Sequence, residues 1–172
     1  MTQIALLLVV VAGCSVDDGG STGPSCMTGT TDTCSGDNVC LKDGCGPAFP
    51  NTYEITNISV TAPNLKSNGM PWDPDEDGTP DLFVTISVAG TIVATTDVNM
   101  NSYNATFAGP FPIMPDAGTA LDLKASDADD GGTSELVYDC PIPSLTASFV
   151  RTGYILCSGT GVTLNATIHV QQ

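Results

Sequence analysis

The sequence predicts an all-β protein, an antiparallel β-sandwich of about eight strands preceded by a short disulfide-stapled segment. Short runs that alternate between apolar and polar residues recur from Tyr53 onward, and no stretch beyond the N-terminus carries a long apolar stripe at helical spacing. The 18 glycines and 12 prolines among 172 residues supply turn signals between these runs at the intervals that a sandwich requires. A chain of this length can bury the core of one domain.

The first 25 residues are expected to be an export signal followed by a tether. Ile4 to Ala12 is an unbroken apolar run, too short to span a bilayer but typical of the hydrophobic part of a secretory signal. It runs into Val-Ala-Gly before Cys14, which resembles the bacterial lipoprotein signal, where this cysteine is lipidated and begins the mature chain. Residues 1–13 are therefore expected to be a signal peptide, and the polar residues 14–25 a flexible tether.

The lipoprotein resemblance implies a protein of the bacterial cell envelope, anchored in the membrane through lipidated Cys14. Because Ser15 rather than Asp follows the cysteine, the resemblance implies the outer membrane or the cell surface. Removing Cys14 from the seven cysteines leaves six, which can all form disulfides in an oxidising compartment. The alternative is an ordinary cleaved signal peptide with a coincidental cysteine.

Residues 26–50 are expected to form a small cysteine-rich segment between the tether and the sandwich. The intervening residues are mostly polar, so such a segment needs covalent staples rather than a core of its own. Four cysteines allow three pairings, all of which stay open. A zinc site is the alternative, although no C-x-x-C pair and no nearby histidine supports it. The four cysteines are Cys26, Cys34, Cys40 and Cys45.

Residues 51–172 are expected to form the sandwich itself. Ile58, Val60 and Ala62 share one face of the first strand, and Ile55 is out of step with them, which indicates a bulge or an early bend. The other expected strands cover residues 82–88, 91–96, 121–125, 136–142, 155–157 and 162–170, with a short, kinked edge segment around 107–113.

Cys140 and Cys157 are expected to form a buried disulfide across the core, because they lie on consecutive strands with inward parity. Pairing of these cysteines with the N-terminal cluster is the alternative. His169 is the only histidine, and no G-x-S-x-G motif is present, so neither acid-base nor serine-nucleophile catalysis is supported. We therefore expect a protein that is not an enzyme.

The charge balance excludes one large class of partners. Nineteen acidic residues face four basic ones, which gives a formal net charge of -15. Nucleic acid is excluded because no basic patch can neutralise phosphates. Unaided binding to anionic lipid is also disfavoured, since it needs clustered Lys and Arg.

Much of the acidic charge is concentrated in two loops. Residues 72–81 place four aspartates and a glutamate around Gly78, and residues 127–135 form a second acidic loop between two strands. Carboxylates at near-alternate positions around a glycine are the hard oxygen ligands that calcium prefers. The local pattern predicts either a calcium loop that uses Asp73, Asp75 and Asp77 or a solvated acidic turn.

The order of strand, acidic loop, apolar strand, hairpin, alternating strand and second acidic loop resembles the C2 domain, the calcium-dependent lipid-binding β-sandwich. Asp75 and Asp81 have the six-residue spacing of the first binding loop of that family, and Asp127, Asp129 and Glu135 fall on the acidic positions of its third. The resemblance implies that these five residues bind calcium. Asp73 and Asp77 then become neighbours that strengthen the local field.

The two resemblances together imply a non-enzymatic calcium-binding module on a bacterial envelope lipoprotein. Such a module is expected to bind lipid headgroups or a surface partner through its calcium loops. Its loops carry few large apolar tips, Met70 and Trp72 being the candidates, and it lacks the basic strand that some C2 domains use for phosphoinositides. The alternative is a structural surface lipoprotein whose acidic loops hold no metal.

Overall fold

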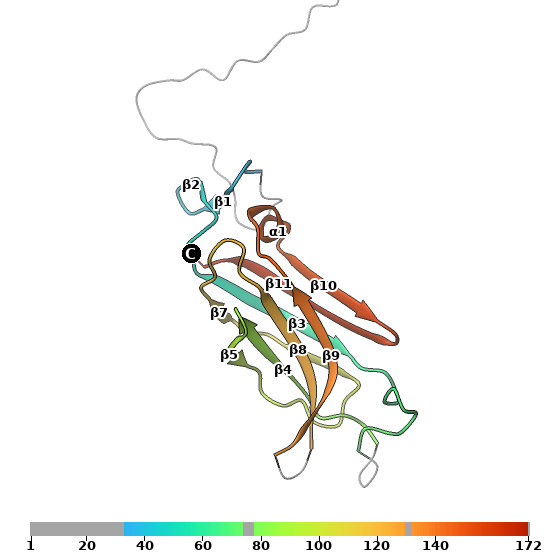
Figure 1. Ribbon diagram of the computed structural model, residues 1–172. Helices are drawn as coiled ribbons and strands as arrows, with labels where there is room; N and C mark the ends of the chain where they lie inside the picture. Colours follow the sequence, from blue (N-terminus) through green and yellow to red (C-terminus); the bar gives the residue numbers. More distant parts are fainter. Residues whose placement is uncertain (1–32, 74–77, 130–131, 172) are drawn as a thin grey trace, which may run out of the picture.

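The computed structural model describes residues 33–73, 78–129 and 132–171. Within these ranges two antiparallel sheets pack face to face, so the predicted all-β sandwich is confirmed (Figure 1). The first sheet holds β3 (Tyr53–Thr61), β6 (Asn104–Phe107), β7 (Phe111–Ile113), β10 (Tyr154–Gly159) and β11 (Val162–Val170). The second holds β4 (Leu82–Val88), β5 (Thr91–Thr95), β8 (Leu121–Ala128) and β9 (Ser134–Ile142).

The strand order is β10-β11-β3-β6 in the first sheet, where β7 also pairs with β3, and β5-β4-β8-β9 in the second. The loops that follow β3 and β8 emerge at the lower end of the sandwich in Figure 1, where β9 begins. Both acidic loops therefore lie at one end of the molecule, although about fifty residues separate them in the sequence.

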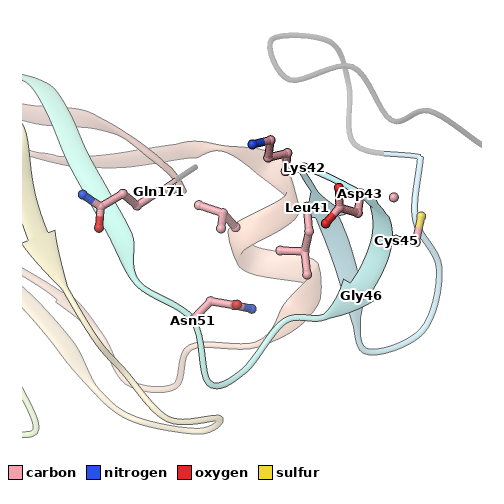
Figure 2. Close-up of a pocket in the computed structure, with 9 residues that line it drawn as sticks. Leu41, Lys42, Asp43, Cys45, Gly46, Asn51 and Gln171 are labelled. Atoms are coloured by element: carbon pink, nitrogen blue, oxygen red, sulfur yellow. The ribbon is translucent and has the colours of Figure 1, made fainter.

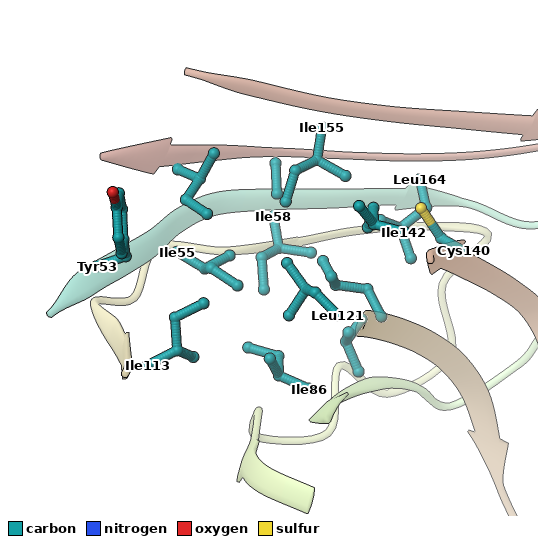
Figure 3. Close-up of a cluster of buried hydrophobic side chains, with 14 of the residues drawn as sticks. Tyr53, Ile55, Ile58, Ile86, Ile113, Leu121, Cys140, Ile142, Ile155 and Leu164 are labelled. Atoms are coloured by element: carbon teal, nitrogen blue, oxygen red, sulfur yellow. The ribbon is translucent and has the colours of Figure 1, made fainter. Parts of the chain in front are cut away.

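The core forms where the inward-facing residues of the two sheets meet (Figure 3). Ile55 and Ile58 from the first sheet and Ile86 and Leu121 from the second are fully buried, as period-two alternation requires. Burial of each such side chain contributes about 1.5–3 kcal/mol. This shared core fixes the sheets rigidly enough to position the loops at their ends.

The irregularity expected at Ile55 is a β-bulge in the middle of β3. The register between β3 and β11 shifts between Asn165 and Thr167, and Asn57 takes a φ of 51°. An inserted residue of this kind resets the alternation, so Ile55 and Ile58 both point into the core despite their odd spacing. The predicted bulge is confirmed.

The end opposite the acidic loops carries a small hairpin of β1 (Asn38–Leu41) and β2 (Gly44–Pro47). A disulfide joins Cys34 to Cys45, and Cys40 is also disulfide-bonded, so the zinc alternative is wrong for these thiols. The segment expected to be a stapled spacer thus contains a two-stranded sheet.

A six-residue helix, α1 (Ala147–Thr152), packs beside the hairpin. The sequence pattern did not predict this helix. Both ends of the helix carry capping residues. The hydroxyl of Thr146 caps the N-terminus by accepting from the amide of Phe149, and Gly153 ends the helix in the left-handed conformation. Two turns are too short for a periodic apolar stripe, so hydrophobic periodicity does not reveal this helix.

The predicted Cys140–Cys157 disulfide is confirmed and joins β9 to β10. The alternative pairing of these cysteines with the N-terminal cluster is therefore wrong. Cys14 and Cys26, like the proposed signal peptide and tether, lie outside the described residues. Within the described ranges, no helix has the length and apolar character needed to cross a bilayer.

Candidate metal centre

Asp127 occupies a core-facing position at the end of strand β8. Leu121, Leu123 and Ala125 point inward along this strand, and Asp127 is the next residue in the same row. It pairs with Leu82 of the neighbouring strand and has no exposed surface. The regular alternation of the strand thus forces a carboxylate into the rim of the core.

The carboxylate of Asp127 is only half satisfied. Its Oδ1 accepts a hydrogen bond of 2.7 Å from the backbone amide of Asp81, whereas its buried Oδ2 has no hydrogen-bond partner among the described residues. Burial raises the pKa of Asp127 to about 6, and the charges of Asp73 and Asp129 add to that rise, although the bond from Asp81 and the charge of Lys66 oppose it. A buried oxygen of this kind is costly unless a cation or a donor reaches it.

Asp73 and Asp129 bring two further carboxylates to Asp127. One oxygen from each of the three residues lies within 4.8 Å of the other two. Asp73 follows Trp72, whose indole is buried and donates a 2.8 Å hydrogen bond to the carbonyl of Pro63. Asp129 begins the turn after β8, where its amide donates to the carbonyl of Thr133. The packing of Trp72 and the end of β8 therefore fix the two sides of the group.

A lysine and a glutamate lie beside the three aspartates. The ammonium group of Lys66 forms an ion pair with Glu135 and lies 5.5 Å from the ring centroid of Trp72. Its side chain is 17% exposed. Desolvation lowers the pKa of Lys66, but the bond to Glu135 and the charges of Glu135, Asp129 and Asp127 together outweigh it and raise the pKa above its ordinary value.

The five predicted ligands have different surroundings in the structure. Asp127 and Asp129 belong to one group of carboxylates. Asp81 lies next to Asp127, but its Oδ1 accepts a 2.7 Å hydrogen bond from the backbone amide of Asn101. Glu135 pairs with Lys66, and Asp75 lies outside the described residues.

Sequence reasoning assigned Asp73 a supporting role, yet the structure groups it with Asp127 and Asp129. The spacing rule of the C2 resemblance pointed to Asp75 instead. The available signal was the neighbouring Trp72, because a lone tryptophan beside a loop commonly packs the base of that loop, as Trp72 does here. Of the two candidate apolar tips, Trp72 is buried and packs the base of its loop, whereas Met70 is exposed.

Three neighbouring carboxylates, of which Asp127 has a buried oxygen without a hydrogen-bond partner among the described residues, can hold a hard divalent cation. Calcium accepts several carboxylate oxygens in a flexible arrangement, whereas magnesium demands a more regular octahedron. The donor set contains oxygen alone, without thiol or imidazole, and this disfavours zinc. The residues present therefore fit calcium.

A hollow at the hairpin end lacks comparable chemistry. It has a volume of about 390 Å³ and is lined by β1, β2 and the last described residues of the chain (Figure 2). Lys42 and Asp43 are its charged lining residues, and the amide of Asn51 is already bonded to the carbonyls of Pro47 and Ala48. Neither a catalytic group nor a buried unsatisfied atom points into it, so it is the weaker candidate.

Solved structures with a similar fold are C2 domains. One structure of a C2 domain superposes with a TM-score of 0.52 at 17% identity over 71% of this chain and 99% of that chain. The first C2 domain of plant Extended Synaptotagmin 1 gives 0.52 at 12% identity over 71% of this chain and 95% of that one. Human GIVD cytosolic phospholipase A2, in complex with an inhibitor and terbium chloride, gives 0.53 at 10% identity over 71% of this chain but only 17% of that chain.

No protein-family model and no curated protein sequence matches the chain. The likeness is therefore one of fold, and the protein is a C2-like β-sandwich. The resemblance inferred from the order of strands and acidic loops is confirmed at this level.

Proposed function

We propose that this protein is a non-enzymatic calcium-binding module of the bacterial cell envelope. In this proposal lipidated Cys14 holds the domain at the outer membrane or cell surface, and a calcium ion bound by the acidic loops links it to anionic lipid headgroups or to a surface partner. Asp73, Asp127 and Asp129 supply the ligands that the described residues bring together. Asp75, Asp81 and Glu135 remain proposed contributors.

The observation that carries the proposal is the buried Oδ2 of Asp127, which lacks a hydrogen-bond partner among the described residues, on a side chain grouped with two further carboxylates. Ionised groups are buried at high cost unless a charge or a metal compensates them. A core-facing aspartate at the end of the otherwise apolar inward row of β8 therefore supports cation binding better than a solvated turn does. Extracellular modules of comparable chemistry bind calcium at about 10⁻⁴–10⁻³ M.

Exposed apolar side chains at the same end support a lipid surface as the partner. Met100 is 65% exposed and adjoins Asn101, whose backbone amide donates a hydrogen bond to Asp81. Leu65 and Met70 lie on either side of Lys66 in the sequence, and they are 50% and 53% exposed. Apolar tips beside a calcium ion combine burial in lipid with attraction to anionic headgroups, so the low content of basic residues does not prevent binding.

Thermal unfolding in calcium and in chelator tests the cation site. At a calcium concentration one hundred times the dissociation constant, one ion adds about 2.7 kcal/mol to the free energy of unfolding, and the midpoint rises by several degrees. Asp127→Asn should abolish this rise while keeping an oxygen to accept the amide of Asp81. Asp116→Asn, an exposed change of the same charge before β8, should preserve it. An unchanged wild-type midpoint would contradict the proposal.

Terbium offers a direct probe of the site, because it is a calcium-sized cation that luminesces when a nearby indole transfers energy to it. The chain has one tryptophan, and Trp72 adjoins Asp73. Sensitised emission that calcium displaces in the wild type, and that is absent in Asp127→Asn, would support the site. Emission of equal strength in both proteins would place the ion elsewhere.

Sedimentation with liposomes distinguishes the two kinds of partner. Vesicles with anionic headgroups should carry down the wild type in calcium but not in chelator, and Met70→Ser with Met100→Ser should weaken this binding. Calcium binding without sedimentation would favour a protein partner. Failure to bind calcium at all would favour the alternative of a structural surface lipoprotein.

A further inference from the structure

We infer that Lys66 is a resident counter-ion of the acidic centre, which an incoming divalent cation must displace, and that it thereby sets the cation affinity of the site. The inference rests on the proposed cation site and adds a residue that none of the ligand predictions contains. It concerns the competition between the ammonium group of Lys66 and a metal ion for the same negative field.

The position of Lys66 is fixed by two contacts of different kinds. Its ammonium group lies over the ring of Trp72 and pairs with Glu135, which is the register partner of Asp127 across β8 and β9. The charges of Asp127 and Asp129 also act on it. Trp72 is itself buried and hydrogen-bonded to Pro63, so the ring forms a rigid platform for the lysine. A solvated surface lysine would make none of these contacts.

The charges explain why a lysine belongs at this position. Three carboxylates within 4.8 Å repel one another, and Oδ2 of Asp127 has no donor among the described residues. The chain has only four basic residues, and one of them lies here. Without a metal ion, Lys66 partly neutralises the group and makes the empty site tolerable.

The same arrangement opposes the binding of a metal ion. A divalent cation among the three aspartates repels the nearby ammonium group, so Lys66 must move away or the site must bear that repulsion. The ion pair with Glu135 also keeps this carboxylate from turning toward the aspartates. Lys66 therefore weakens cation binding and suits the site to surroundings rich in calcium.

Calorimetric titration of the mature chain with calcium tests the inference. Lys66→Met should lower the dissociation constant about tenfold, because one interfering charge has gone. Lys66→Arg keeps the charge and should bind like the wild type. Lys66→Gln serves as a second neutral variant if methionine disturbs the packing against Trp72.

Lys124→Met is the matched control, because it also removes one positive charge and one ion pair. Lys124 pairs with Asp139, and both of these side chains are exposed. Its dissociation constant should change less than about twofold, because an exposed charge is screened. Equal shifts for Lys66→Met and Lys124→Met, or no shift for either, would overturn the inference. Absence of calcium binding in every protein would instead refute the cation site itself.

The fluorescence of Trp72 gives an independent readout. Because the ammonium group lies against this ring, its displacement by calcium should change the emission of the single tryptophan in the wild type. Lys66→Met should bind calcium with a much smaller change in emission. An emission change of the same size in both proteins would mean that the ammonium group does not move when calcium binds.

Discussion

The two ends of the sandwich differ in how their polar groups are satisfied. At the hairpin end, irregular backbone is held by satisfied groups: a disulfide joins Cys34 to Cys45, and the guanidinium of Arg151 donates to the carbonyls of Gly36 and Asn38 at 2.6 and 2.8 Å. At the acidic end, the buried Asp127 keeps an oxygen without a hydrogen-bond partner among the described residues. The backbone groups of the hairpin end are satisfied, whereas the acidic end retains a buried carboxylate that lowers stability.

This difference supports the acidic end as the location of the proposed site. Both ends grow from the same core, so the unsatisfied carboxylate is not a consequence of poor packing overall. The buried oxygen of Asp127 lies within a group of three carboxylates, at the edge of a core that is otherwise largely apolar. Local strain or cost that persists in an otherwise consistent structure is most often found at functional sites.

The largest expected effect is the response of the acidic end to pH in the absence of divalent cations. The pKa of Asp127 is about 6 in the folded protein and 3.8 without the fold, so the folded state binds the proton more tightly. Its contribution to the free energy of unfolding is therefore greatest at low pH and falls by up to about 3 kcal/mol as pH rises from about 4 through 6.

Urea unfolding of the wild type and of Asp127→Asn at pH 4 to 7, in chelator, measures this contribution. The difference between the two proteins isolates Asp127, because the other acidic groups titrate in both. Asp127→Asn should be the more stable of the two at pH 7 and should lose this advantage near pH 4. A difference that stays constant over this range would contradict the buried-charge interpretation.

The hairpin end should lose stability when its staple is removed. Cys34→Ala with Cys45→Ala opens a loop with a sequence separation of 11 residues, and the chain-entropy estimate for such a loop is up to about 3 kcal/mol. Hydrogen exchange should accelerate in β1 and β2, while the calcium dissociation constant stays unchanged. A weakened calcium affinity would show that the two ends are coupled.

The smallest effect is expected from the arginine that joins the helix to the hairpin. Arg151→Met removes two hydrogen bonds from a charged donor to backbone carbonyls, and we expect a loss of about 1–2 kcal/mol, since the site is partly exposed. Chemical denaturation measures it. Arg151→Lys should recover part of the loss, and the calcium response of every variant should match the wild type.

The sequence by itself determined the fold class, the strand periodicity, the bulge near Ile55 and the Cys140–Cys157 disulfide. Each of these follows from period-two alternation or from parity along a strand, which are local properties of the chain. The sequence prediction ended this strand at Ala125, whereas β8 continues to Ala128 and carries Asp127 in its inward row.

Only the tertiary structure decided which residues share the acidic centre. Asp73 lies about fifty residues before Asp127 and joins it because the buried Trp72 fixes the loop against Pro63, which no spacing rule records. Lys66, which follows the first sheet's β3, reaches the same centre by pairing with Glu135 of β9 in the other sheet. Electrostatic partners depend on through-space distance and burial, and the packing of the two sheets establishes both.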